Sequence, residues 1–70
     1  MKRIVVTSSN IRSIGYEASS YTLEIEFKDL TTYRYHNVPE AVHSLLMASE
    51  SHGKYFNQHI RDRYLTTKLG

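Results

Sequence analysis

Cysteine and tryptophan are absent from this chain, proline occurs once, glycine occurs three times, and no apolar run approaches the roughly 18 residues of a membrane span. The lack of cysteine excludes disulfides, thiolate metal sites and a thiol nucleophile. Three scattered glycines cannot form a phosphate-binding loop. The amino terminus also lacks the apolar stretch of a secretory signal. We therefore expect a soluble, cytoplasmic protein that does not insert into a membrane.

The length sets a second limit. Seventy residues allow one core, and a domain this small buries only about 60% of the surface that its unfolded chain would expose. We predict a single domain over residues 1–70 with a modest reserve of stability.

The clearest pattern is a β-hairpin in the middle of the chain. Residues 21–28 (YTLEIEFK) alternate apolar and polar side chains, and residues 31–36 repeat the alternation. A third strand over residues 11–18 precedes them, so short turns should pair the three antiparallel in chain order. A fourth edge strand is present if Ile4–Val6 pairs as well.

Two positions in this segment are unusual. Gly15 inside a strand indicates a bulge or a close backbone approach. Leu30 stands where the hairpin turn favours glycine, so either the turn avoids positive φ or this residue is strained.

The second half of the chain predicts two helices. Pro39 is suited to the first helical position, and apolar residues then recur at helical spacing as far as Ser49. Ser51 can cap a second helix, and residues 64–70 form a short extended piece or a frayed end. The fold is therefore α+β, with a three-stranded or four-stranded antiparallel meander packed against two carboxyl-terminal helices. Its predicted core is Leu23, Ile25, Phe27, Val42, Leu45, Leu46, Phe56 and Ile60.

Charge is distributed unevenly along the chain. Residues 1–16 carry three bases and no acid, residues 17–50 carry six acids against two bases, and residues 51–70 carry four bases against one acid. Because the termini of small domains often meet, the basic ends should form one surface opposite an acidic sheet face that holds Glu24 and Glu26. The alternative is an ordinary mixed surface.

No residue pattern indicates an enzyme. The run Ser8–Asn10 favours a turn and lacks a G-x-S-x-G motif. Glu24 and Glu26 are better explained as solvated carboxylates than as an acid–base pair. We predict no catalytic residue, no metal and no cofactor. The four histidines match no metal-binding spacing and are His36, His43, His52 and His59.

The strand segment Tyr33-Arg34-Tyr35 offers one functional hypothesis. Tyrosines on a sheet stack on unpaired bases while arginine and lysine hold phosphates. The competing interpretation places Tyr33 and Tyr35 beneath the helices as core.

Six segments of the chain, in their order and spacing, are also informative. They are SSNI at Ser8–Ile11, IGY at Ile14–Tyr16, TLEIEF at Thr22–Phe27, YRY at Tyr33–Tyr35, VP at Val38–Pro39 and YFNQHIRDRY at Tyr55–Tyr64. Together they resemble the KTSC domain, whose signature is a central Y-x-Y. That family comprises short domains found alone in bacterial and phage proteins and at the carboxyl end of some lysyl-tRNA synthetases. The synthetase association implies a role in RNA binding.

Two functions therefore follow from the sequence. The first is a non-enzymatic RNA-binding or tRNA-binding module. The second is a protein-interaction module that pairs through an exposed sheet edge, with another protein or with itself as a homodimer. The residues that the first hypothesis assigns to nucleic acid are Tyr33, Arg34, Tyr35, Lys54, Arg61 and Arg63.

Overall fold

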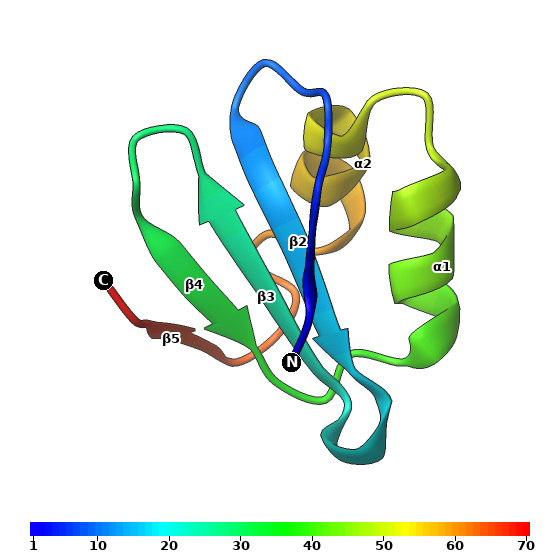
Figure 1. Cartoon of the computed structure of the whole chain (residues 1–70). Helices are drawn as coiled ribbons and strands as arrows, with labels where there is room; N and C mark the ends of the chain where they lie inside the picture. Colours follow the sequence, from blue (N-terminus) through cyan, green and yellow to red (C-terminus); the bar gives the residue numbers. More distant parts are fainter.

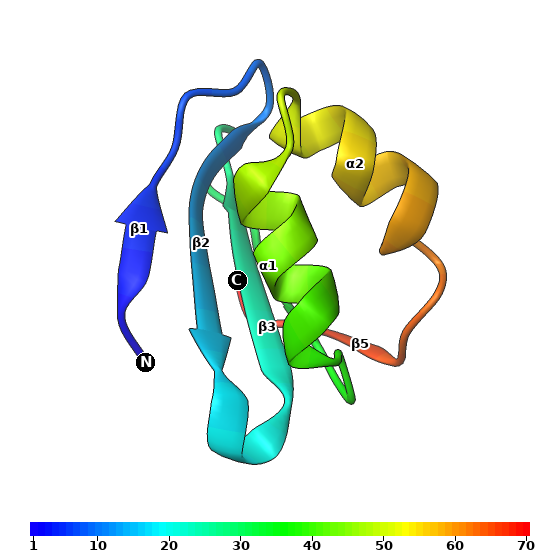
Figure 2. The same cartoon turned by 90° about the vertical axis from the view of Figure 1, so that its right-hand side faces the viewer.

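Short connections make strands that follow one another in the sequence neighbours in the sheet. The computed structural model describes all residues from Met1 to Gly70. Its five strands pair antiparallel in the order β1-β2-β3-β4-β5 (Figure 1), and two helices lie on one side of the sheet (Figure 2). The elements are β1 (Arg3–Val5), β2 (Ile11–Glu17), the short 3-10 helix η1 (Ala18–Ser20), β3 (Thr22–Phe27), β4 (Thr32–Tyr35), α1 (Glu40–Ala48), α2 (His52–His59) and β5 (Thr66–Lys68).

The predicted meander and the two helices are confirmed, and the sheet is larger than predicted. β1 forms the fourth strand, and β5 adds a fifth beside β4. The sequence of β5, TTK, has no apolar alternation, so its pairing could not be foreseen from periodicity. It reaches β4 only after the chain has passed through both helices.

The helix boundaries follow from local capping. Pro39 precedes α1 as its N-cap, with φ −62° and ψ 148°, one position before the predicted one. Ser51 caps α2 as predicted, since its side chain accepts a hydrogen bond from the Lys54 backbone N–H. Neither helix has the length and apolar character needed to cross a bilayer.

The core lies between the helices and β2, β3 and β4. Five of the predicted members are buried in it, and Phe27 and Val42 are half-buried against it. Leu45 was predicted wrongly, because it is 56% exposed. The inward row of α1 runs through Val42 and Leu46, whereas Ala41 and Leu45 lie on the next row, which faces solvent. The nine buried residues are Ile11, Ile14, Leu23, Ile25, Tyr35, Val38, Leu46, Phe56 and Ile60.

The hairpin turn between β3 and β4 strains one residue. Leu30 has φ 72°, the left-handed conformation that favours glycine. Its backbone N–H donates to the Phe27 carbonyl at 2.9 Å, and the Asp29 carboxylate accepts from the backbone and hydroxyl of Thr31. The turn is therefore held by its neighbours, and of the two alternatives for Leu30 the strained one is correct.

A cluster of charged residues lies on the face of the sheet that is opposite the helices. Arg3, Gly15, Glu24 and Arg34 lie opposite one another on four adjacent strands. The Glu24 carboxylate accepts from the Arg3 guanidinium at 2.7 Å and from that of Arg34 at 2.6 and 3.0 Å. A Cβ at Gly15 would lie 3.0 Å from the Arg3 side chain. Gly15 is thus the site of a close approach, and the bulge lies between Ile11 and Ser13.

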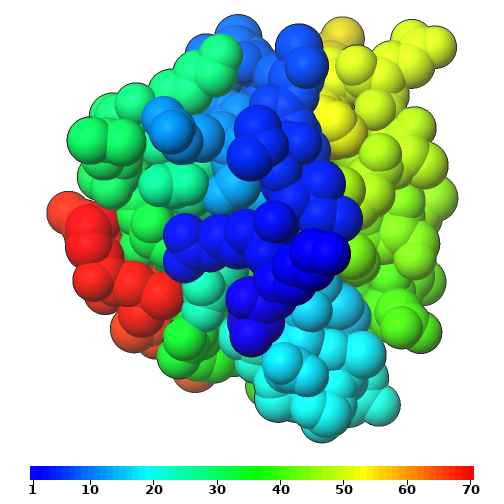
Figure 3. Space-filling view, viewed as in Figure 1, coloured from blue at the N-terminus to red at the C-terminus, as the bar shows by residue number.

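The charge cluster corrects two predictions about this face. Glu24 is only 6% exposed and is not solvated. Arg3 and Arg12, from the basic amino-terminal segment, pair here with Glu24 and Glu26, and Figure 3 shows the amino-terminal residues, in dark blue, lying over this face. The face is therefore not acidic, and these two bases do not join those of the carboxyl-terminal segment.

The ionisation of Glu24 follows from its partners. Burial alone would raise the pKa of this carboxyl, but hydrogen bonds from Arg3 and Arg34, together with their charges, outweigh burial and hold the pKa below its ordinary value. Glu24 is therefore a charged group shared by two cations.

The adjacent leucines of α1 provide a matched test of the packing. Leu46→Ala removes a side chain that is fully buried, so it should lower the free energy of unfolding by about 2 to 5 kcal/mol. Leu45→Ala, on the exposed row, should change it by less than about 0.5 kcal/mol. Urea unfolding of both variants measures the difference. Equal losses would show that α1 is rotated from the described orientation.

Glu24 should make stability depend on pH in acid. Because its folded-state pKa is lowered, its contribution is complete above the ordinary value of 4.5 and is lost as the pH falls through the folded-state value. Glu24→Gln should therefore cost roughly 1 to 3 kcal/mol at neutral pH and much less near about pH 3. Urea unfolding at the two pH values tests this. A cost that stays constant between them would contradict the proposed ionisation.

Candidate functional site

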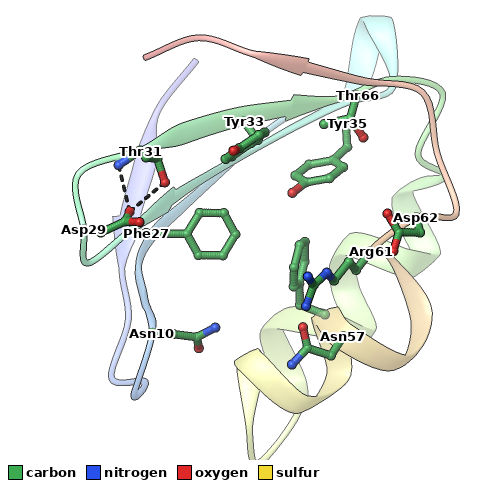
Figure 4. Close-up of a pocket in the computed structure, with 11 residues that line it drawn as sticks. Asn10, Phe27, Asp29, Thr31, Tyr33, Tyr35, Asn57, Arg61, Asp62 and Thr66 are labelled. Atoms are coloured by element: carbon green, nitrogen blue, oxygen red, sulfur yellow. Dashed lines mark hydrogen bonds between the residues drawn. The ribbon is translucent and has the colours of Figure 1, made fainter.

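A groove opens between the β3–β4 hairpin, β5 and helix α2. Its volume is about 440 Å³, within the usual range for small-ligand sites of roughly 300 to 1,000 Å³. Figure 4 shows its lining side chains converging from the sheet and from α2 on a common space. Side chains of α2 and of the strands face each other across it.

Four aromatic rings form the apolar wall of the groove. Phe27 meets Tyr33 and Phe56 edge-on, with ring centroids 5.9 and 5.5 Å apart, and Tyr35 meets Phe56 at 5.4 Å. Edge-to-face contacts of this kind fix the ring orientations. Tyr35 and Phe56 are buried, whereas Phe27 and Tyr33 remain half-exposed. The two outer rings can therefore contact a ligand.

Tyr35 contributes a polar group as well as packing. Burial, reinforced by the neighbouring Tyr33, raises the pKa of Tyr35 to about 12. Its hydroxyl points into the groove (Figure 4). This hydroxyl therefore stays protonated at neutral pH and can donate a hydrogen bond to a molecule in the groove.

The cation of the groove is Arg61, which follows α2. Its guanidinium forms none of the salt bridges of the chain, and Figure 4 shows it pointing into the groove beside Asn57. Asn10, from the loop before β2, approaches from the other side. An unpaired guanidinium and two amides can bind a planar ligand that carries hydrogen-bonding edges and a negative charge.

Two carboxylates limit where negative charge can enter the groove. Asp29 lies at the opposite end from Arg61 (Figure 4). Hydrogen bonds from Thr31, with a smaller contribution from the charge of Lys68, hold the pKa of Asp29 below its ordinary value. Asp62 lines the groove next to Arg61. An anionic group is therefore best accommodated at the Arg61 guanidinium.

The structure brings together only part of the predicted nucleic-acid-binding set. Tyr33, Tyr35 and Arg61 line the same groove. Arg34 lies on the opposite face of the sheet and is bound to Glu24, because adjacent strand residues point to opposite faces.

The other two predicted cations lie outside the groove. Lys54 lines a smaller hollow of about 280 Å³ beside the loop between the helices. The Arg63 guanidinium donates to the Gln58 carbonyl at 3.3 Å. Neither side chain faces the aromatic wall.

Sequence reasoning missed several groove residues. It assigned Phe27 and Phe56 to the core, placed Asn10 in a turn, and gave no binding role to Asn10 or Asn57. These residues come from separate segments that only the folded chain brings together. The available signal was the position of Phe27 at the end of β3, next to the hairpin turn. No group of three or more histidine, cysteine, aspartate or glutamate side chains could hold a metal ion.

Comparison with known proteins identifies the family. The sequence profile of the KTSC domain matches residues 7–64. The crystal structure of a KTSC domain protein from Yersinia pestis has a TM-score of 0.96 and 40% sequence identity, and the match covers 99% of this chain and 97% of that one. A protein of Stutzerimonas stutzeri is 43% identical over 58 residues, covering 83% of this chain and 82% of the relative.

One relative is much longer than this chain. The lysine–tRNA ligase of Nostoc punctiforme is 36% identical over 61 residues, which span 87% of this chain but 11% of the ligase. The family profile matches the sequence of this chain, and the Yersinia pestis structure matches its fold. This chain therefore belongs to the KTSC domain family.

Proposed function

We propose that this KTSC domain is a non-catalytic module that binds single-stranded RNA, with an unpaired stretch of tRNA as the favoured target. The observation that carries the proposal is the unpaired Arg61 guanidinium beside a half-exposed aromatic wall. Positive charge combined with stacking surface is the usual arrangement for binding unpaired nucleotides.

Each part of a nucleotide has a partner in the groove. A base can stack on the exposed parts of Phe27 and Tyr33, because every base presents a π-face. The Tyr35 hydroxyl and the Asn57 amide can bond the base edge, and Arg61 can bind the adjoining phosphate. The volume of about 440 Å³ limits the groove to a short segment.

The charges also limit the path of the strand. Asp29, at the end of the groove opposite Arg61, would repel a phosphate there. The backbone should therefore approach at Arg61 and leave toward solvent, with the base directed inward. This arrangement requires an unpaired base, since a base within a duplex cannot enter the groove.

The comparisons lend associational support. A segment similar to this chain forms part of the lysine–tRNA ligase of Nostoc punctiforme. A domain attached to an enzyme that acts on tRNA has RNA within reach. The groove supplies the physical basis that the association lacks.

The test is binding of a labelled, mixed-sequence single-stranded RNA, measured by fluorescence anisotropy at several salt concentrations. Arg61→Gln should weaken binding to all sequences and reduce the slope of log affinity against log salt by about 0.7, the value for one phosphate contact to a single strand. Tyr33→Leu, which keeps an apolar side chain in place, should lose on the order of 1 to 3 kcal/mol of binding with little change in slope.

Arg63→Gln is the matched control, because this arginine lies two residues from Arg61 but outside the groove. Its effect should be small. If both arginine variants lose affinity equally, a diffuse basic surface and not the groove binds RNA. If the wild-type affinity is no tighter than ~10⁻⁴ M at physiological salt, the RNA proposal is wrong.

A further inference from the structure

The outer edge of β5 has unused hydrogen-bonding groups. Leu65 accepts from the His36 backbone N–H at 2.9 Å, and the Leu69 N–H donates to the Thr32 carbonyl at 2.8 Å. In an antiparallel sheet, residues whose backbone groups bond to the neighbouring strand alternate with residues whose backbone groups point away from it. The backbone N–H and C=O groups of Thr66 and Lys68 therefore point away from β4. No strand lies beyond them (Figure 1).

Exposed leucines flank this edge. Leu65 is 75% exposed and Leu69 is 43% exposed. They share with Thr67 one face of the sheet, the face opposite to the groove, because alternate residues of a strand point the same way. The Thr67 hydroxyl meets His36 Nε2 on that face at 2.9 Å.

We propose that a second copy of this chain pairs with β5, antiparallel and centred on Thr67. In this register Thr66 faces Lys68 of the second copy, and each pair exchanges two backbone hydrogen bonds. Leu65 faces Leu69 of the second copy, and the two-fold symmetry repeats that apolar contact. Thr67 faces its own equivalent across the axis.

Charge favours this register and this edge. Each Lys68 ammonium lies opposite a threonine, so no two like charges face each other across the seam. At the other edge of the sheet, Lys2 precedes β1 and Arg3 begins it, so pairing two β1 strands would bring together two Lys2 ammonium groups and two Arg3 guanidinium groups that are each bound to Glu24. Clustered edge charges are a common means of preventing strand pairing.

The pairing has a consequence for the groove, which rests on the proposed RNA function. The two-fold axis of an antiparallel strand pair is perpendicular to the sheet, so both grooves open on the same side. The two β4 strands are then three strand spacings apart, roughly 14 Å. Thr66 lines each groove, so one RNA strand could occupy both grooves and gain avidity.

The experiment measures association without RNA, so its outcome does not depend on the RNA proposal. A short-strand interface is small, so sedimentation velocity should cover concentrations from about 10 µM to about 1 mM, where weak association is detectable. The wild-type chain should convert from monomer to dimer within this range. A chain that stays monomeric throughout overturns the inference.

Two charge variants test the register at exposed positions. Leu65→Lys with Leu69→Lys places ammonium groups opposite each other and should weaken the dimer by at least about tenfold. Leu65→Glu with Leu69→Lys places a carboxylate opposite an ammonium and should restore it. Unchanged association in the double-lysine variant, or failure of the glutamate–lysine variant to associate, would refute this register.

Val5→Lys is the control at the other edge. Val5 belongs to β1 and is exposed, so the substitution should leave the dimer intact. If it abolishes association while the double-lysine variant still dimerises, the β1 edge pairs and the proposal for β5 is wrong.

Discussion

The sharing of one buried carboxylate by two arginines determines how this sheet is arranged. Glu24 holds Arg3 of β1 and Arg34 of β4, and Gly15 leaves the space through which the Arg3 side chain crosses β2. A slip of one residue would turn this polar row toward the helices and the apolar row toward water. Once the row is fixed on one face, the next row, through Ile25 and Tyr33, must face the core and the groove.

The groove lies at the β4–β5 end of the sheet, between the strands and α2. Phe56 and Asn57 of α2 line it together with Tyr33 and Tyr35 of β4. Aromatic residues at that end pack against the core with one side of the ring and face the groove with the other. Tyr35 combines both roles, because its ring is buried and its hydroxyl faces the groove.

Local sequence patterns predicted the strands and helices well. They predicted poorly which distant residues come into contact. The alternation around Leu23 and the capping serine at Ser51 placed strands and helices correctly, because both signals act over a few residues. The partners of Glu24 could not be predicted, since Arg3 and Arg34 come from strands on either side. The same limit explains why the charge pattern suggested an acidic face and why the groove was only partly anticipated.

We propose that RNA binds in the groove and not on the charged face of the sheet. A titration of the ¹⁵N-labelled domain with a short single-stranded RNA, followed by NMR, locates the contact directly. The shifted amides should cluster at Tyr33, Asn57 and Arg61. A cluster of shifts around Arg12 and Arg34, with the groove amides unmoved, would contradict it.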